Sequence, residues 1–306
     1  MTESALSTLS HHGKSFRFAG RLLGQGQLQE AAKLYQFCRW VDDLADDNDD
    51  SVIAANQLSQ ISESFLGNTQ SRDPIINEYI QFFDKHAISP ELPITLVNGV
   101  KSDLSPARVQ DQDQLIQYAY QVAGVVGLMM CPILGADKQG YDFAVDLGLA
   151  MQLTNIARDV KEDAEMGRRY LPYSWCPHSP EEILSDDKHI RKTTLNSVKT
   201  LLQLAEKYYD SARVGLQFLP PQSRRAIAVA LSVYRHIGIL IAQQHYQYWL
   251  PRCVVPPYKK VWIAAQALWQ LPTFSAATRQ AHQKELHLPL AQFKQPPNAV
   301  CYENGL

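Results

Sequence analysis

Two segments far apart in the chain carry oxygen-bearing side chains at a spacing of four residues. The first contains Asp42 and Asp46, and the second contains Asn155, Asp159 and Asp163. A four-residue step along an α-helix advances about 6 Å and turns slightly more than one revolution, so the members of each set face the same way. Carboxylate and carbonyl oxygens are the hard ligands that Mg²⁺ prefers, and Mg²⁺ completes its shell with water and substrate phosphates. Two such faces opposite each other would form a metal clamp for diphosphate chemistry.

The aspartate run at residues 42–50 also has an ordinary explanation, which is a solvated end of a helix. That explanation suits the last two aspartates of the run. It does not suit Asp42, Asp43 and Asp46, because carboxylates four residues apart repel one another and are unfavourable near the negative end of a helix. The lead-in at residues 37–41 is largely apolar, which places these carboxylates beside a core.

The second segment could equally be the wet face of an amphipathic helix, on which Arg158, Lys161 and Glu162 pair with the acidic residues. However, the residues before Asn155, at positions 150–154, are mostly apolar, and a wet face would not normally continue into them. The two segments together therefore specify a metal site more sharply than either does alone.

Helices are the elements that must position these residues. Apolar residues recur at three- and four-residue spacing in windows that include 28–47, 51–66, 111–131, 140–163, 194–217 and 222–249. Strand-like alternation is scarce, and turn residues such as Gly24–Gly26 and Pro220–Pro221 separate the windows. We expect an all-α fold with one domain at 1–275. The polar, proline-bearing residues 276–306 are expected to form a loosely held tail.

Composition narrows the function classes. The 306 residues are 45% hydrophobic and 20% charged, which is enough for an extensive core with a cavity inside it. A net charge of −2 gives no reason to expect nucleic acid as a partner. The five cysteines are scattered and odd in number, which is typical of reduced thiols, and the N-terminus shows no export signal. A cytoplasmic location is therefore expected. Residues 114–136 are uncharged but contain three glutamines and a proline, so a buried helix explains them better than a bilayer span.

With both motifs considered, the chain resembles the squalene and phytoene synthases, which join prenyl diphosphates head to head. The resemblance extends from about His12 to Lys260, and the motifs at residues 152–163 and 167–172 are most similar to those of the bacterial phytoene synthases. It implies a single-domain isoprenoid synthase bundle of helices around a central apolar cavity. It also implies that Mg²⁺, with Mn²⁺ as a substitute, bridges the substrate diphosphates on five residues, namely Asp42, Asp46, Asn155, Asp159 and Asp163.

The resemblance also assigns roles to individual positions. A flap at residues 12–16, in which Gly13 stands where a serine is often found, would contact diphosphate. Tyr118 would lie near the reacting carbons, and Tyr35 and Arg39 would take part in catalysis on the diphosphate side. The full set of implied diphosphate contacts is His12, Lys14, Ser15, Tyr35, Arg39, Gln152, Arg158, Tyr246 and Arg252.

The activity implied is the joining of two geranylgeranyl diphosphates to phytoene through a cyclopropyl (prephytoene) diphosphate, without NADPH. This is the first step of carotenoid biosynthesis. The segment Val122–Met130 would line the tail cavity, although its small residues could equally serve close helix packing. Three alternatives stay open: squalene or dehydrosqualene synthesis from two farnesyl diphosphates, chain elongation, and a non-catalytic assembly factor. Downstream carotenoid enzymes and loose attachment to the inner face of the membrane are compatible with so apolar a product.

Overall fold

The computed structural model describes residues 14–46, 50–67, 71–105, 108–271 and 281–293. Within these ranges the chain is helical and contains no β-strand, only an isolated bridge between Arg108 and Arg169. The prediction of an all-α fold is therefore confirmed. In chain order the α-helices are α2 (Lys14–Gly20), α3 (Gln25–Asp46), α4 (Ser51–Phe65), α5 (Pro74–Lys85), α6 (Glu91–Ser102), α7 (Gln112–Ala119), α8 (Val125–Leu134), α9 (Tyr141–Arg158), α10 (Val160–Glu165), α11 (Pro180–Ile183), α12 (Lys188–Gly215), α13 (Pro221–Gln243) and α14 (Pro257–Trp269).

The predicted helical windows match these helices with three corrections. The window 140–163 is not one helix, because the backbone leaves helical geometry at Asp159 and divides α9 from α10. The window 222–249 is too long, since α13 ends at Gln243 and His245 and Tyr246 both have positive φ angles. The window 111–131 contains a π-helical turn, η1 (Tyr120–Gly124), between α7 and α8.

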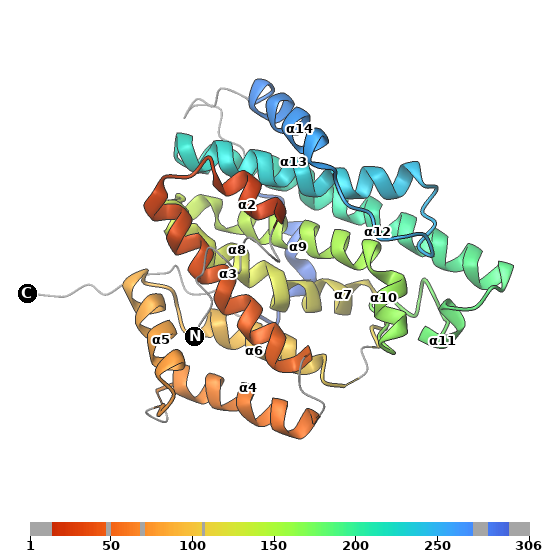
Figure 1. Cartoon of the computed structure of the whole chain (residues 1–306), viewed down its shortest axis with the longest axis horizontal. Coiled ribbons are helices and arrows are strands. Elements are labelled where there is room, and N and C mark those ends of the chain that lie inside the picture. The colour runs from red at the N-terminus through yellow and green to blue at the C-terminus, as the bar shows by residue number, and fades with distance from the viewer. Residues whose placement is uncertain (1–13, 47–49, 68–70, 106–107, 272–280, 294–306) are drawn as a thin grey trace, which may run out of the picture.

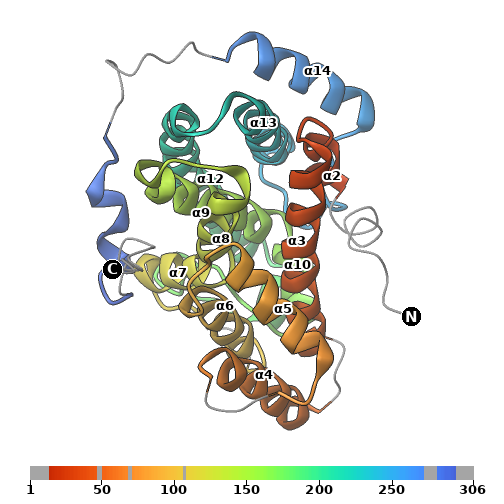
Figure 2. The ribbon, with the colours of Figure 1, turned by 90° about the vertical axis from the view of Figure 1, so that its left-hand side faces the viewer.

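Helix α9 lies at the centre of the bundle (Figures 1 and 2). It packs against α8, η1, α12 and α13. In Figure 2, α4 to α6 lie toward one end of the bundle, and α14 lies at the other end, outside α13. The residues of α9 are apolar on most sides, and ten of the eighteen are buried. A helix without a polar face is stable only when other helices surround it, which explains its central place.

Glycines allow α8 and η1 to approach α9 more closely than side chains would permit. A Cβ atom on Gly127 would lie 2.2 Å from the carbonyl oxygen of Ala144, and one on Gly148 would lie 2.3 Å from that of Ala123. Gly127 also lines the large apolar cavity described below. Gly127 therefore serves close helix packing and also borders the cavity, while room for a tail stays a prediction.

Two helical stretches are long and apolar enough to cross a membrane by length and composition, Gln112–Leu134 and Pro221–Gln243. Both pack within the bundle, and about half of each is buried against other helices. Core packing explains their hydropathy, as expected for residues 114–136.

The C-terminal residues that the structure describes differ from the expected loosely held tail. Ala281–Phe293, which include the 3₁₀ helix η5 (Lys284–Leu290), pack against the bundle. The Nε2 atoms of His282 and His287 each lie 2.8 Å from an oxygen of Asp146, which is completely buried in α9. The hydroxyl of Tyr208 also donates to the carbonyl of Leu286 at 3.0 Å. Because a buried carboxylate needs hydrogen-bond donors, Asp146 holds this segment in place.

This contact generates a prediction about pH and stability. Burial acts to lower the pKa of His282, but the hydrogen bond with Asp146 outweighs burial, so the pKa of His282 is raised. Burial acts to raise the pKa of Asp146, but the two histidines outweigh burial, so the pKa of Asp146 is lowered. The contribution of His282 to the free energy of unfolding is therefore complete below about pH 6.5 and is lost as pH rises through its raised folded pKa. The Asp146 contribution is present above about pH 3.9 and is lost as pH falls through its lowered folded pKa.

We expect the double variant His282→Gln/His287→Gln to unfold at a lower temperature than the wild type, with a loss of about 3 kcal/mol. The buried carboxylate of Asp146 loses both histidines in this variant and keeps the hydroxyl of Ser211 as a donor. Thermal unfolding followed across pH should show the largest difference between about pH 4 and pH 6.5. The exposed His189 offers a matched control as His189→Gln. A difference that does not change with pH would contradict the assignment.

Candidate functional site

A cavity of about 290 Å³ brings the two acidic segments together, and we call it the acidic cavity. Its carboxylates come from α3, from the residue after α6, and from the junction of α9 and α10. Besides Tyr118, Gln152 and Tyr170, the oxygen-bearing residues on its walls are Asp42, Asp46, Asp103, Asn155, Asp159 and Asp163. All five residues expected to hold metal therefore face one space.

The break between α9 and α10 does not disturb the four-residue register of the second segment. The amide of Asp159 donates to the carbonyl of Asn155 at 2.9 Å, and the amide of Asp163 donates to the carbonyl of Asp159 at 2.8 Å. These helical hydrogen bonds cross the non-helical residue, whose φ and ψ angles are −106° and 16°. The three side chains consequently share the cavity although they do not share one helix.

Asp159 is held between two arginines. Its oxygens accept hydrogen bonds from Arg158 at 2.6 and 2.7 Å and from Arg252 at 2.7 and 2.8 Å. Burial alone would raise the pKa of Asp159, but the two guanidinium groups outweigh burial and the pKa is lowered. The structure thus brings together three predicted site residues in a planar, doubly paired contact of the kind arginine makes with carboxylate or phosphate.

Asp42 and Asp163 lack such compensation. Burial raises the pKa of Asp42 to about 7, with Arg39 opposing and the neighbouring Asp46 adding to the effect. Burial also raises the pKa of Asp163 to about 7, with the charge of Asp159 adding to it. In addition, the buried Oδ1 atom of Asn155 has no hydrogen-bond partner. An all-oxygen set of donors with uncompensated negative charge fits a hard divalent cation.

The donors of the acidic cavity are spread over its walls. Among the described residues, the one group of three His, Cys, Asp or Glu donors within 4.8 Å is Asp146, His282 and His287, which lines neither cavity. There each histidine lies at hydrogen-bond distance from a different oxygen of Asp146, so hydrogen bonds account for that group. A cation in the acidic cavity would need further ligands in addition to the residues of any one wall. Mg²⁺ commonly takes such ligands from water and substrate phosphate.

Tyr118 lies in the acidic cavity in a network that the sequence did not predict. Its hydroxyl donates to one oxygen of Asp103 at 2.8 Å, and the hydroxyl of Tyr170 donates to the other at 2.8 Å. The two rings stack with centroids 4.9 Å apart. Burial raises the pKa of Asp103 even though both tyrosines oppose this. Arg168 completes the wall and donates to Asp46 at 3.1 Å.

The sequence offered a signal for Tyr170 and Arg168 but none for Asp103. Tyr170 and Arg168 lie in the segment 167–172, which supported the family resemblance, so that segment could have suggested them. Asp103 is a single carboxylate after a helix with no repeated spacing. Only the packing of α6 beside η1 and α8 brings it to the site.

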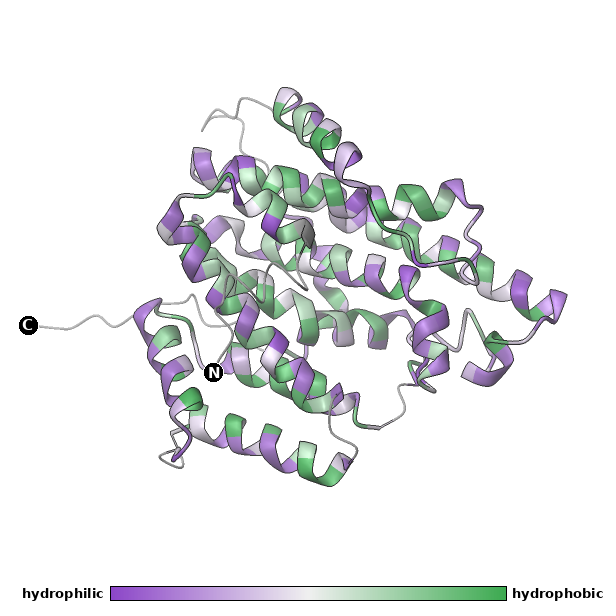
Figure 3. Cartoon of the chain, viewed as in Figure 1, coloured by the Kyte–Doolittle hydropathy of each residue, from purple (hydrophilic) through white to green (hydrophobic). Residues whose placement is uncertain are grey.

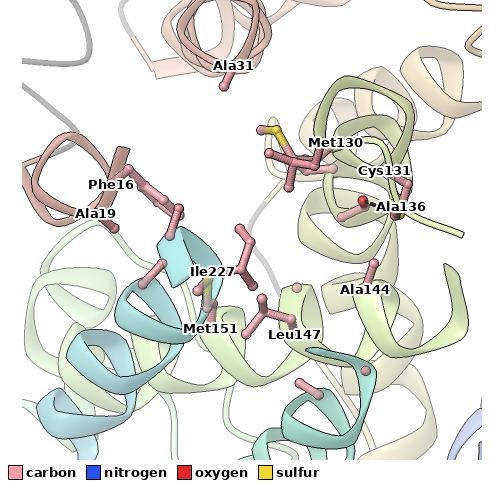
Figure 4. A pocket seen from close by; sticks show the side chains of 18 of the residues that line it. Phe16, Ala19, Ala31, Met130, Cys131, Ala136, Ala144, Leu147, Met151 and Ile227 are labelled. Carbon is pink, nitrogen blue, oxygen red and sulfur yellow. Dashed lines mark hydrogen bonds between the residues drawn. The ribbon is translucent and has the colours of Figure 1, made fainter. Parts of the chain in front are cut away.

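The second cavity, of about 310 Å³, is apolar and lies among α2, α3, η1, α8, α9 and α13; we call it the apolar cavity. Figure 4 shows side chains from several of these helices around one space, including Phe16, Ala31, Met130, Leu147 and Ile227. On α9 the lining runs from Phe143 to Asn155, a helical distance of about 18 Å. Gln152 and Asn155 line both cavities, so the apolar cavity meets the acidic one at these residues. With a divalent cation in the acidic cavity, the pair of cavities would suit a ligand with an anionic head and a long apolar tail.

Tyr35 and Arg39 are not among the residues that line the acidic cavity, and Arg39 lines neither cavity. Tyr35 lines the apolar cavity, and burial raises its pKa to about 12, so its hydroxyl stays protonated. Arg39 pairs with Asp43 at 2.5 Å, and its buried Nε atom has no hydrogen-bond partner. In this structure neither group is placed to contact an anion inside the acidic cavity.

The remaining predicted contacts are placed less fully. His12 lies outside the described residues, and Lys14 and Ser15 begin α2 but their side chains lie outside the described part. Tyr246 follows α13 with a φ angle of 59° and packs against the core. It lines neither cavity. Of the predicted diphosphate contacts, Gln152 and Arg158 face the acidic cavity.

Comparison with known proteins agrees with this architecture. The squalene/phytoene synthase family model matches residues 9–259. The 15-cis-phytoene synthase of Pantoea ananas is 36% identical over 80% of this chain and 84% of its own length. That of Enterobacter agglomerans is 36% identical over 89% and 97%, respectively.

Among solved structures, a dehydrosqualene synthase in complex with ligand superposes with a TM-score of 0.75 and 27% identity, covering 87% of this chain and 95% of that one. Squalene synthase HpnC from Alicyclobacillus acidocaldarius shares the fold with a TM-score of 0.66 and 20% identity, covering 78% of this chain and 92% of that one. The prediction of an isoprenoid synthase type of bundle is confirmed.

The raised pKa values generate a prediction that needs no activity measurement. Because the folded pKa values of Asp42 and Asp163 lie near 7 and above the unfolded value of about 3.9, the ionised pair destabilises the protein above pH 7. This penalty decreases as pH falls through the folded pKa values, and it is gone only near the unfolded value of about 3.9.

Without metal, we therefore expect the unfolding temperature to rise as pH falls from 8 to about 6, and Asp42→Asn/Asp163→Asn to remove most of that rise. Adding Mg²⁺ at pH 8 should raise the unfolding temperature of the wild type but not that of the variant. Scanning calorimetry with and without a chelator measures both effects, with the exposed Asp84→Asn as the matched control. Equal Mg²⁺ shifts in all three proteins would exclude the site.

Proposed function

Since this chain belongs to the squalene/phytoene synthase family, we propose that it is a prenyltransferase that joins two geranylgeranyl diphosphates to phytoene. The reaction passes through a cyclopropyl (prephytoene) diphosphate and is the first step of carotenoid biosynthesis. The curated phytoene synthases at 36% identity support this choice of substrate. The observation that carries the proposal is an apolar cavity that meets an acidic one at Gln152 and Asn155.

The metal proposed is Mg²⁺, with Mn²⁺ as a substitute, because the inward donors are all oxygens. Its ligands would be Asp42, Asp46, Asn155, Asp159 and Asp163, all on the walls of the acidic cavity. When bound, the metal acts as a Lewis acid that stabilises a departing diphosphate. Divalent metal use and prenyl diphosphate substrates agree with the family of the chain.

The protein's own groups hold charge and exclude water. Arg158 faces the acidic cavity and is already paired with Asp159, so a diphosphate could share its guanidinium donors. The apolar cavity keeps water from the carbocation, which water would convert to an alcohol. Tyr118 is held by Asp103 at the acidic cavity, where its ring can stabilise a nearby cation by about 0.5–2 kcal/mol.

Tyr35 and Arg39 are proposed to act from the junction of the cavities. Tyr35 lines the apolar cavity and its hydroxyl is protonated, so it can donate to a substrate oxygen that reaches the junction. Arg39 would have to leave its ion pair with Asp43 in order to bind diphosphate. His12, Lys14, Ser15, Tyr246 and Arg252 are kept as proposed diphosphate contacts on the family resemblance. The reaction is proposed to use no NADPH, to take place in the cytoplasm, and to pass its product to downstream carotenoid enzymes.

A second candidate is dehydrosqualene or squalene formation from two farnesyl diphosphates. It is favoured by one observation, the superposition with a dehydrosqualene synthase at 27% identity over most of both chains. Tail length distinguishes the two candidates, and the length of the apolar cavity therefore becomes the quantity to test.

The first experiment incubates the purified protein with each diphosphate, with and without Mg²⁺ and NADPH, and identifies products by chromatography. We expect phytoene from geranylgeranyl diphosphate with Mg²⁺ alone. Asp42→Asn should lower turnover by about a thousandfold, since a metal supplies several kcal/mol of transition-state stabilisation. Asp84→Asn, exposed on α5, should leave it unchanged. Mg²⁺-independent substrate binding with no product would instead favour a non-catalytic family member.

The second experiment changes the depth of the apolar cavity. Ala144 lines it within the first turns of α9 and is seen in Figure 4. Ala144→Phe should shorten the space, so kcat/KM for geranylgeranyl diphosphate should fall relative to that for farnesyl diphosphate by about tenfold or more. Ala144→Ser, which adds little volume, should keep the wild-type ratio. Equal effects on both substrates would mean that the tail does not reach Ala144.

A further inference from the structure

Helix α14 lies on the outside of the bundle and has an apolar face that no described residue covers. Figures 1 and 2 show it at the edge of the molecule, next to α13. Its inner side, with Ile263 buried, packs on α13. Its outer side carries Tyr258, Val261, Trp262 and Trp269, which are 71%, 61%, 63% and 90% exposed.

The spacing of these side chains forms one continuous stripe. With Ala265, which is also exposed, they follow the helical positions i, i+3, i+4, i+7 and i+11. A helix on the surface of a globular protein normally has polar side chains on the face opposite its core contact. Here that opposite face is aromatic and aliphatic. Figure 3 shows α14 as a mixture of green and pale residues, because tyrosine and tryptophan have intermediate hydropathy on the scale used. Such a stripe indicates a second apolar environment.

The charge of the surrounding chain indicates which environment this is. The 74 residues from Ser211 to Lys284 contain no aspartate or glutamate but nine lysines and arginines, although the whole chain has a net charge of −2. Two of the nine are paired with acidic residues of earlier helices, Arg235 with Glu206 and Arg252 with Asp159. Lys259 is half-exposed beside the aromatic stripe, and Arg225 of α13 is exposed. A segment without acidic residues, with Lys259 next to the stripe in the helix, complements an anionic surface.

We propose that α14 is a peripheral membrane-binding helix that lies in the interface of an anionic phospholipid bilayer. Tryptophan and tyrosine prefer the level of the lipid headgroups, and lysines beside them attract anionic lipid. The same composition gives a protein partner no charged group on the stripe to recognise. The inference does not depend on the proposed reaction, although it gives that reaction a location.

The position of α14 relative to the apolar cavity agrees with this. Helix α13, which carries α14, supplies Ala226, Ile227, Ala230 and Tyr234 to the cavity wall. The helix that would touch lipid is thus one helix layer from the space proposed for the prenyl tails. A bilayer surface at this place would lie close to where an apolar product forms.

The experiment measures co-sedimentation of the full chain with vesicles. We expect binding to phosphatidylcholine–phosphatidylglycerol vesicles and weaker binding to pure phosphatidylcholine. Trp262→Gln/Trp269→Gln should weaken binding to the anionic vesicles by about tenfold or more, because two interfacial anchors are lost. Lys259→Gln should weaken it by about fivefold, the effect of one lysine near the surface.

The matched control is Val52→Gln/Ile53→Gln, which removes two exposed apolar side chains from α4 at the far end of the bundle. It should bind vesicles like the wild type. A measurement that needs no variant is quenching of wild-type tryptophan fluorescence by brominated lipid, which should be stronger in anionic vesicles than in pure phosphatidylcholine.

Three results would overturn the proposal: equal binding by the tryptophan variant and the wild type, equal loss in the α4 control, or no vesicle binding by the wild type. If light scattering shows a wild-type dimer that the tryptophan variant abolishes without any vesicle binding, the stripe is a contact between copies instead. Product formation in detergent micelles is measured separately. Its absence would count against the proposed reaction and would leave the membrane result unaffected.

Discussion

The mutual repulsion of carboxylates in a partly buried space is the constraint on which the rest of this structure depends. Asp42, Asp46, Asp103 and Asp163 face one cavity, and burial raises the pKa of three of them above its ordinary value. A protein maintains such an arrangement only where a cation or another partner offsets the charge. The acidic cavity is therefore a site that the fold keeps at a cost to its own stability, as functional sites often are.

Different parts of the cavity wall meet this constraint in different ways. Asp159 has two arginines, and its pKa is lowered. Burial raises the pKa of Asp103, and the two tyrosine hydroxyls that donate to it oppose this shift without cancelling it. Asp42 and Asp163 have neither kind of partner, and they belong to different acidic segments of the chain. The wall thus combines a preformed cationic side with a side that is open to an external cation.

The apolar half of the site depends on close packing instead of charge. Gly127 and Gly148 let the backbones of α8 and η1 touch α9, and this contact fixes one wall of the apolar cavity. On the opposite side of α13, helix α14 carries an aromatic stripe that has no partner in the described part of the chain. One helix, α13, therefore separates the proposed tail-binding space from the proposed lipid-binding surface.

The sequence by itself determined the helical class, the approximate place of the long helices and the two acidic segments, because these depend on local periodicity and spacing. It did not determine that α9 ends at Arg158, since the four-residue hydrogen bonds continue across the break and leave the spacing unchanged. It also could not reveal Asp103, or the docking of His282 and His287 on Asp146. Those contacts join residues that no local pattern links, and only the packing of distant helices brings them within hydrogen-bond distance.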